Sequence, residues 1–543
     1  MTDRERNRRL EWVAAVMAAA FLGLVLRLVF LHLLTEETAR RAVEEKGTIV
    51  KPILTGRGRI LEGSKASNIV ALNVGMSDLC ADPKILTESN LTERAAIALG
   101  GILGLDPEEL RGRFEQPDKR FVYVLRQVPE DRVRQALELK IPGVFTRETT
   151  LRRYPQGGTM CHVLGFSNLE GVGTAGVELV ADRYLKGSQG LIESRLDGRR
   201  REMYGWRVQD IQPQEGADVY LTIDENVQYM AETALDRAME KNRARAGWVI
   251  VQRIRTGEIL ALVNRPHYDL NAFRTARSEQ MLNRAIGQVF EPGSVFKVLA
   301  ISAALSEGVV TTNQVFATEN GRWAHMGKIL RDYHPYAQLT VSDIFKKSSN
   351  IGTAKIALLL GQERFHRYLR DFGIGRKTGV DLPGEEKGIL HPVEKWSGIS
   401  LSRISIGQGV SVTALQMLGV VNAVANDGFL MKPYLIKRVV AKDGTVLYKG
   451  APEVVGRPIR GDTARIMRDL MARVTEAGGT GTRAAIEGYR VGGKTGSAQK
   501  PGPGGYSETD YMATFVGFLP VDSPEISLIV TLDEPQPLHT GGL

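Results

Sequence analysis

The sequence predicts an α+β protein. In it, a C-terminal domain with an antiparallel sheet and a helical subdomain follows an elongated mixed α/β pedestal domain and one N-terminal transmembrane helix. Three observations predict this: one long apolar run near the N-terminus, strand-like runs at both ends of the C-terminal part, and a mostly helical stretch between them. At 543 residues the chain is too long for one ordinary core. We expect a tail at 1–11, the transmembrane anchor at 12–34, the pedestal at 35–217 and the C-terminal domain at 218–543.

The apolar run extends from Trp12 to Leu34 and is interrupted only by Arg27 and His32. Its length suits one helical span of a bilayer. Four arginines precede it, at positions 4, 6, 8 and 9, and acidic residues follow it at 36 and 37. This bias places the N-terminus in the cytoplasm and the remainder outside, as for a single-pass membrane protein. A cleaved signal peptide is the alternative, but the run is long and no small-x-small cleavage site follows it.

The composition is that of a globular protein, with 43% hydrophobic and 24% charged residues. The formal net charge of +9 is spread along the chain without a Lys/Arg-rich block, so we expect no nucleic-acid binding. Cys80 and Cys161 are too few for a disulfide framework. Either they form one bridge or they are two buried thiols, and we expect thiols.

The pedestal alternates short strand-like runs, such as 121–125, with charged helical stretches, such as 131–140, and with Gly-rich turns. It contains no nucleophile–base pairing, which indicates a scaffold or docking role. The C-terminal domain opens with a strand at 218–224, and Asp224 is placed to cap a helix at 225–241. Further strands are expected at 247–251, 258–263, 490–498, 511–519 and 526–532, with helices filling 296–455.

The first chemical motif is Ser294-Val295-Phe296-Lys297, an SxxK tetrad. It follows Glu291-Pro292-Gly293 and begins a helix, where free backbone N–H groups favour a developing negative charge. Lys297 falls one turn later on the same face, and its apolar neighbours are expected to lower its pKa so that it can act as a base. A second SxxK, Ser497 to Lys500, lies in an expected strand, where residues three apart face opposite ways.

The second motif, Ser348-Ser349-Asn350, closes a helical stretch at 341–347. A hydroxyl and an amide two residues apart can flank a nucleophile, the first relaying a proton and the second holding a peptide carbonyl. Standing alone, the motif is more typical of a polar helix end.

The third motif is Lys494-Thr495-Gly496, followed by Ser497, on an expected strand. A cation and a hydroxyl on a strand suit a substrate carboxylate, and backbone N–H groups there can meet an oxyanion. A second copy at 377–379 lies in turn-rich sequence, and we interpret it as structural. Each motif alone is weak, but their order and contexts together form the set that marks penicillin-binding proteins and β-lactamases.

The chain resembles the class B penicillin-binding proteins, and among them the FtsI-type cell-division D,D-transpeptidases. The resemblance covers nearly the whole chain and is carried by spaced blocks as well as the three motifs. These blocks are Arg57-Gly58-Arg59-Ile60, Arg153-Tyr154-Pro155, Gly165-Phe166, Gly173 to Glu178, Leu221 to Asp224, Glu291 to Ser294, and Gly407-Gln408-Gly409 with Thr413 and Gln416.

The resemblance implies that Ser294 attacks the penultimate D-alanine of a peptidoglycan stem peptide, that Lys297 takes its proton, and that Ser348 and Asn350 assist. Lys494 and Thr495 of the Lys494-Thr495-Gly496 triplet then bind the donor's carboxylate, and the backbone N–H groups of Ser294 and Ser497 form the oxyanion hole. It implies that the membrane is the bacterial inner membrane, and it implies no metal or organic cofactor. Implied partners are nascent glycan strands, an FtsW-type glycosyltransferase and other division proteins, with β-lactams as inhibitors and the pedestal as a dimerisation or docking domain.

Three features of the sequence depart from the family pattern. Leu61 to Ser64 replaces the usual Asp-Arg-Asn/x-Gly, and Ser497 stands where Thr is commoner. Because such proteins usually continue into a final helix beyond the position of Leu543, we expect the C-terminal end to be truncated. The alternatives are an elongation-type transpeptidase, a β-lactamase, and a non-catalytic division scaffold or β-lactam sensor.

Overall fold

The structure of the protein is a computed structural model. It describes residues 3–30, 48–53, 55–196, 202–502, 505–537 and 541–542. The chain forms two compact units. One comprises Met1–Thr55 with Gly187–Glu215, and the other Gly56–Lys186 with Gly216–Leu543.

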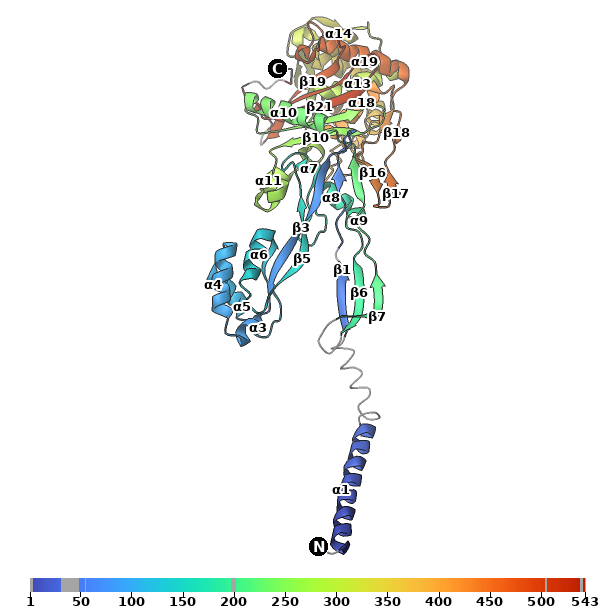
Figure 1. The fold of residues 1–543 in the computed structure, drawn as a ribbon. Coiled ribbons are helices and arrows are strands. Elements are labelled where there is room, and N and C mark those ends of the chain that lie inside the picture. The colour runs from blue at the N-terminus through green and yellow to red at the C-terminus, as the bar shows by residue number, and fades with distance from the viewer. Residues whose placement is uncertain are drawn as a thin grey trace. The chain divides into compact units, whose positions relative to one another are not determined.

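The first unit begins with helix α1 (Asp3–Val29), whose stretch Leu10–Val29 is exposed and is long and apolar enough to cross a membrane (Figure 1). This stretch coincides with most of the expected anchor at 12–34, and positions 31–34 lie outside the described residues. The rest of the unit is a three-stranded antiparallel sheet with β6 in the centre. Its strands are β1 (Thr48–Ile53), β6 (Gly190–Leu196) and β7 (Glu202–Ile211).

The second unit begins with a lobe built on the long strand β3 (Ile69–Ala81), which pairs antiparallel with β4 (Val122–Val128) and β5 (Val144–Arg153). Four helices pack around Leu79, Leu99 and Phe114. They are α3 (Pro83–Glu88), α4 (Thr92–Leu103), α5 (Pro107–Phe114) and α6 (Glu130–Glu138). Strand β4 and helix α6 confirm the strand and helix expected at 121–125 and 131–140.

A second sheet region connects this lobe to the C-terminal part. Strand β2 (Ile60–Leu61) pairs antiparallel with β3 and parallel with β8 (Asp218–Leu221). Strand β8 also pairs with β16 (Ile436–Val440), which pairs with β17 (Val446–Lys449). Strand β8 ends at Leu221 and is shorter than the strand expected at 218–224. Just beyond it, the Thr222 N–H donates to the Leu435 carbonyl and the Thr222 hydroxyl to the Ile259 carbonyl, each at 2.7 Å.

The main sheet is antiparallel, as the sequence predicts, and its five strands lie in the order β10-β9-β21-β20-β19. Its strands are β9 (Ala246–Arg253), β10 (Ile259–Arg265), β19 (Gly492–Gly502), β20 (Gly505–Leu519) and β21 (Ile526–Asp533). Helix α10 (Glu225–Asn242) covers one face, and Asp224 caps it by accepting from the N–H groups of Asn226 and Val227. The expected cap is confirmed.

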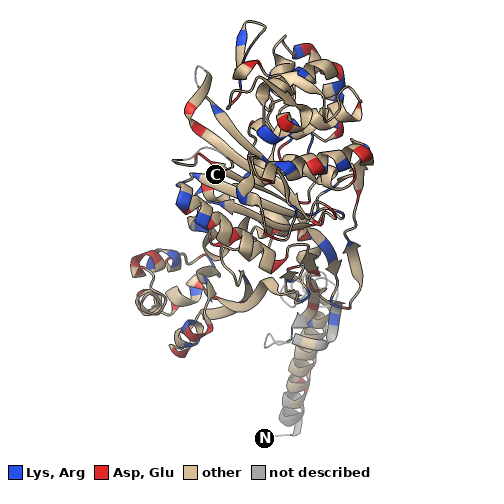
Figure 2. Ribbon diagram, turned by 90° about the horizontal axis from the view of Figure 1, so that it is seen from above, with Lys and Arg blue, Asp and Glu red and all other residues tan. Residues whose placement is uncertain are grey.

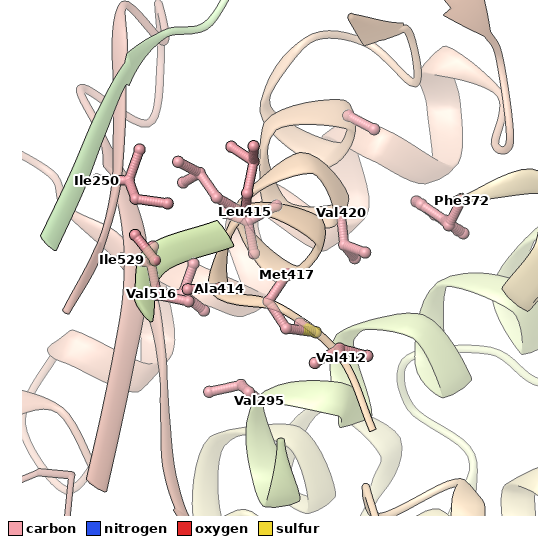
Figure 3. Close-up of a cluster of buried hydrophobic side chains, with 14 of the residues drawn as sticks. Ile250, Val295, Phe372, Val412, Ala414, Leu415, Met417, Val420, Val516 and Ile529 are labelled. Carbon is pink, nitrogen blue, oxygen red and sulfur yellow. The ribbon is translucent and has the colours of Figure 1, made fainter. Parts of the chain in front are cut away.

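Alternation along strand β9 divides the core between the two faces of this sheet. Val249 and Val251 pack with α10, while Trp248 and Ile250 face the opposite side. On that side, Ile250, Val516 and Ile529 lie against Ala414, Leu415 and Met417 of α18 (Ala414–Ala425) (Figure 3). The sheet is therefore buried between two helical layers.

The middle of the chain is mostly helical, as expected, with three small two-stranded sheets. Its other α-helices are α11 (Ser278–Met281), α12 (Arg284–Gly287), α13 (Lys297–Ser306), α14 (Val341–Lys347), α15 (Asn350–Leu360), α16 (Gln362–Asp371) and α17 (Ser400–Ile404), and α19 (Gly461–Thr475) follows. The small sheets pair β11 (Val315–Ala317) with β14 (Gln338–Thr340), β12 (Arg322–His325) with β13 (Lys328–Arg331), and β15 (Leu430–Met431) with β18 (Val454–Gly456). Short helices α7 (Cys161–Leu164), α8 (Gly176–Val180) and α9 (Asp182–Leu185) complete the unit.

The two cysteines are free and buried, as expected. Burial raises the pKa of the Cys80 thiol to about 11 and that of Cys161 to about 12. Charged residues of both signs are mixed along the described helices (Figure 2), which agrees with the absence of a Lys/Arg block in the sequence.

A buried ion network joins three blocks of the pedestal that are far apart in sequence. The carboxylate of Glu178, which has no exposed side-chain surface, accepts from Nε of Arg57 and Nε of Arg152, each at 2.6 Å. Arg57 also binds Asp182 at 2.6 Å, and the Tyr154 hydroxyl donates to Glu178 at 3.3 Å. A buried carboxylate between two guanidinium groups compensates both, so removal of its charge leaves two buried cations without their main partner.

We predict that Glu178→Gln lowers the free energy of unfolding of this unit by about 3–5 kcal/mol, because breaking a buried ion network leaves uncompensated charge. A thermal melt of the purified protein measures the effect as a lower Tm. Glu170→Gln is the matched control: its carboxylate pairs with Arg126 at 3.2 Å but is 61% exposed. This control should change stability by less than about 0.5 kcal/mol. Equal melting temperatures for the two variants would contradict a stabilising network.

Candidate functional site

Ser294 lies on a 3₁₀ turn, Gly293–Phe296, that leads directly into helix α13. Gly293 has a φ of +58°, in the left-handed region that glycine adopts without strain. Its N–H donates to the Gly407 carbonyl at 3.1 Å, an approach so close that a Cβ on Gly407 would lie 2.2 Å from the Gly293 oxygen. Ser294 is half-buried, and its hydroxyl forms no hydrogen bond with any part of the chain that the structure describes. The turn therefore presents a hydroxyl that is not engaged elsewhere.

Lys297 is the first residue of α13 and is fully buried beside Phe296 and Val298. Its Nζ donates to the Ser348 carbonyl at 2.6 Å, to Ser348 Oγ at 3.1 Å and to Asn350 Oδ1 at 2.7 Å. Burial lowers the pKa of Lys297 to about 7, against the opposing charge of Asp332. A substantial share of this amine is therefore neutral near neutral pH, the form that can accept a proton.

The second motif occupies the break between α14 and α15. Ser348 ends α14 with a φ of +59°, and its N–H bonds the carbonyls of Ile344 and Phe345. Ser349 caps α15 by accepting from the Gly352 N–H at 2.9 Å. This reversal directs both Ser348 Oγ and Asn350 Oδ1 to the Lys297 amine.

The third motif lies on β19, the edge strand of the main sheet. Lys494 is fully buried, and its Nζ donates to Ser348 Oγ at 2.9 Å and to the Thr495 carbonyl at 3.1 Å. Burial, with the nearby Lys297, holds the pKa of Lys494 well below its ordinary value. Thr495 Oγ1 shares a hydrogen bond of 2.8 Å with Thr480 Oγ1.

Gly496 brings β19 against the turn that carries Ser294. A Cβ on Gly496 would lie 3.0 Å from the Pro292 oxygen and 3.0 Å from a methyl group of Val295. The next residue, Ser497, is exposed, and its Oγ accepts from the Gly541 N–H at 2.9 Å. All three motifs therefore converge, and Ser348 Oγ receives hydrogen bonds from two buried amines, one from each flanking motif.

The second copies of the SxxK and KTG motifs lie outside the site and make other contacts. In the second SxxK, Lys500 pairs with Asp533 at 2.8 Å and Glu534 at 2.6 Å. In the second KTG triplet, the Glu385 carboxylate accepts from the N–H and hydroxyl of Thr378 and from the N–H of Gly379. That triplet is a carboxylate-bound turn, which agrees with the structural interpretation made from the sequence.

Two residues at the site are missing from the sequence analysis. The Asp332 carboxylate contacts Ser349, Asn350 and Ile351, and Thr480 contacts Thr495. Neither belongs to a motif, and each lies well before its partner in the chain, so that no local spacing indicates the contact. Among the described residues, no group of three or more His, Cys, Asp or Glu side chains could hold a metal ion.

Comparison with known protein families gives two matches. Residues 247–543 match the penicillin-binding protein transpeptidase domain, and residues 52–221 match the penicillin-binding protein dimerisation domain. Among curated relatives, the chain is 32% identical to the probable peptidoglycan D,D-transpeptidase PenA of Neisseria meningitidis, covering 97% of this chain and 88% of that protein. It is also 32% identical to the peptidoglycan D,D-transpeptidase FtsI of Escherichia coli, covering 96% of this chain and 86% of that protein.

Solved structures agree with these matches. Penicillin-binding protein 3 of Mycobacterium tuberculosis aligns with a TM-score of 0.70 at 27% identity, over 91% of this chain and 92% of that one. A peptidoglycan synthetase from Bifidobacterium adolescentis aligns with a TM-score of 0.73 at 26% identity, over 91% and 94%. The chain therefore belongs to the class B penicillin-binding proteins and carries their transpeptidase domain.

Proposed function

We propose that this protein cross-links peptidoglycan stem peptides during septal cell-wall synthesis, through an acyl-enzyme formed on Ser294. One observation carries the proposal: an unengaged serine hydroxyl lies one helical turn before a buried lysine whose pKa is about 7. A weakly acidic hydroxyl needs such a base to become a nucleophile at neutral pH.

Acylation follows from the positions of the side chains. Ser294 Oγ attacks the carbonyl carbon of the penultimate D-alanine, and the Lys297 amine accepts the hydroxyl proton. The negative charge that develops on the carbonyl oxygen is stabilised by the backbone N–H groups of Ser294 and Ser497, which lie on the turn and on the edge strand beside it. The C–N bond then breaks, and the terminal D-alanine leaves with a proton.

Ser348 is suited to deliver that proton, because its hydroxyl accepts from Lys297 at 3.1 Å and from Lys494 at 2.9 Å. Asn350 orients the donor peptide, while Lys494 and Thr495 bind its terminal carboxylate. An amine on a second stem peptide attacks the acyl-enzyme, which releases Ser294 and forms the cross-link.

The septal role rests on family analogy. Asn350 in the third place of the second motif is typical of the division type, whereas the elongation type often carries Asp there. By the same analogy, α1 anchors the catalytic domain outside the inner membrane, and an FtsW-type glycosyltransferase supplies nascent glycan strands. Inhibition by β-lactams is supported by the M. tuberculosis relative, whose structures include complexes with ampicillin and aztreonam.

We predict that Ser294→Ala abolishes covalent labelling by a fluorescent penicillin and leaves the Tm within about 2 °C, because a half-buried hydroxyl without hydrogen bonds contributes little stability. Gel fluorescence and mass spectrometry of the adduct measure the outcome. Ser397→Ala, an exposed serine that bonds only Ser400 with its hydroxyl, is the control and should label normally. Labelling that survives Ser294→Ala would move the nucleophile elsewhere. Rapid loss of label from the wild type would favour a β-lactamase, and no labelling would favour a scaffold.

We predict that the second-order acylation rate constant rises with pH through an inflection near 7, the pKa of Lys297. Below that pH the amine is protonated and cannot accept the Ser294 proton, so the rate should fall about tenfold per pH unit. Stopped-flow acylation between about pH 5.5 and 9, with circular dichroism at each pH to verify folding, provides the measurement. A profile that is flat across this range, or an inflection near 10, would exclude Lys297 as the general base.

We predict that cells depleted of the protein form filaments, because septal cross-linking fails while elongation continues. Phase-contrast microscopy of a conditional strain reports the shape, and re-expression of the wild type is the control. Rounded cells would instead support the elongation-type alternative.

A further inference from the structure

Asp332 lies outside the three motifs, yet its carboxylate bonds both Ser349 and Asn350 of the second one. Its Oδ1 accepts from the backbone N–H groups of Asn350 and Ile351, the latter at 3.0 Å, and its Oδ2 accepts from Ser349 Oγ at 2.6 Å. The carbonyl of the preceding residue, Arg331, accepts from Asn350 Nδ2 at 2.8 Å. Two consecutive residues thus hold the three residues that open α15.

These contacts determine how the Asn350 amide is oriented. Because Nδ2 donates to the Arg331 carbonyl, Oδ1 faces the opposite way and accepts from Lys297 Nζ at 2.7 Å. The first N–H groups of α15 have no acceptor within the helix, and a carboxylate there also interacts favourably with the helix dipole. The orientation of Asn350 is therefore set by a neighbouring strand.

Asp332 is itself held firmly. Its N–H donates to the Gly321 carbonyl at 3.1 Å, and it directly follows strand β13, which pairs with β12. Leu330 on β13 is buried in a small core with Ile351 and Ala354 of α15. This shared core packs β13 against α15, next to the point where the Asp332 carboxylate contacts the motif.

Asp332 also acts on the Lys297 amine by its charge. The charged groups that face this buried amine are Lys494 on β19 and Asp332. The positive charge of a protonated Lys494 would disfavour the ammonium form of Lys297, whereas Asp332 favours it. Loss of the carboxylate charge therefore lowers the pKa of Lys297 further below its ordinary value.

We propose that Asp332 is a positioning residue for acyl transfer, holding the Asn350 amide and the Lys297 amine in their reactive arrangement from outside the motifs. The proposal rests on the proposed function of Ser294, Lys297 and Asn350.

The test compares Asp332→Asn and Asp332→Glu with the wild type, as full-length protein in detergent, by the pH profile of acylation with a fluorescent penicillin. Asp332→Asn removes the charge, so its inflection should move to lower pH by roughly half to one unit. Its plateau rate should fall at least about tenfold, because the hydrogen-bonding pattern around Asn350 is disturbed. Asp332→Glu keeps the charge, so its inflection should stay near that of the wild type while its plateau falls.

Asp343→Asn is the matched control. Asp343 lies in the first turn of α14, and its carboxylate accepts from Thr340 Oγ1 at 2.7 Å without contacting the site. It should keep the wild-type inflection and a rate within about twofold.

A loss of rate in Asp332→Asn that is equal at every pH and accompanied by a lower Tm would overturn the proposal in favour of a purely structural role. A wild-type profile would overturn it outright. If Asp332→Asn fails to fold, the plateau rate of Asp332→Glu decides: a lower plateau with the wild-type Tm supports the proposal, and a wild-type plateau overturns it. Failure of the proposed function can be distinguished from failure of this proposal, because in that case the wild-type protein itself would not be labelled at Ser294.

Discussion

Two lysine amines without solvent contact meet at one serine hydroxyl, and the arrangement of the site depends on this contact. Lys297 and Lys494 are both fully buried, and both donate to Ser348 Oγ. Burying an ammonium group costs several kcal/mol, so the neutral amine gains population and each N–H seeks an acceptor. The break between α14 and α15 supplies acceptors for both amines, because Ser348 Oγ accepts from Lys297 and from Lys494. It therefore connects α13, which carries Lys297, to β19, which carries Lys494.

The break itself holds a strained residue. Ser348 has a φ of +59°, a left-handed conformation that costs a non-glycine residue about 1 kcal/mol or more. Hydrogen bonds from its own N–H, the cap by Ser349 and the two amines at its hydroxyl all favour this conformation. These contacts hold Ser348 in its left-handed conformation, which places its hydroxyl between the end of α14 and the start of α15. Close approaches at Gly293, Gly407 and Gly496 complete the packing, since a side chain at any of them would hold the backbones apart.

Much of this was predictable from the sequence, because it depends on local periodicity. Strand-like apolar runs next to turn residues predicted the strands of the main sheet, and Asp224 predicted the start of α10. Motif context correctly separated Ser294 from Ser497 as a helix start, and the turn chemistry around Lys377 marked that triplet as structural. These predictions depend on residues only a few positions apart, because the spacing between such residues determines which side chains share one face of a helix or strand.

The sequence by itself determined which side chains are the candidates for the chemistry: a hydroxyl and an amine one turn apart, a serine and an amide at a helix break, and a lysine on a strand. The tertiary structure alone decided that Lys297 and Lys494 share Ser348, that Asp332, which directly follows β13, holds Asn350, and that β8 pairs with β2 and β16. The reason is physical. Desolvation, ion pairing and strand partners depend on distances between segments remote in the chain, and no local pattern encodes which remote segment will occupy the neighbouring space.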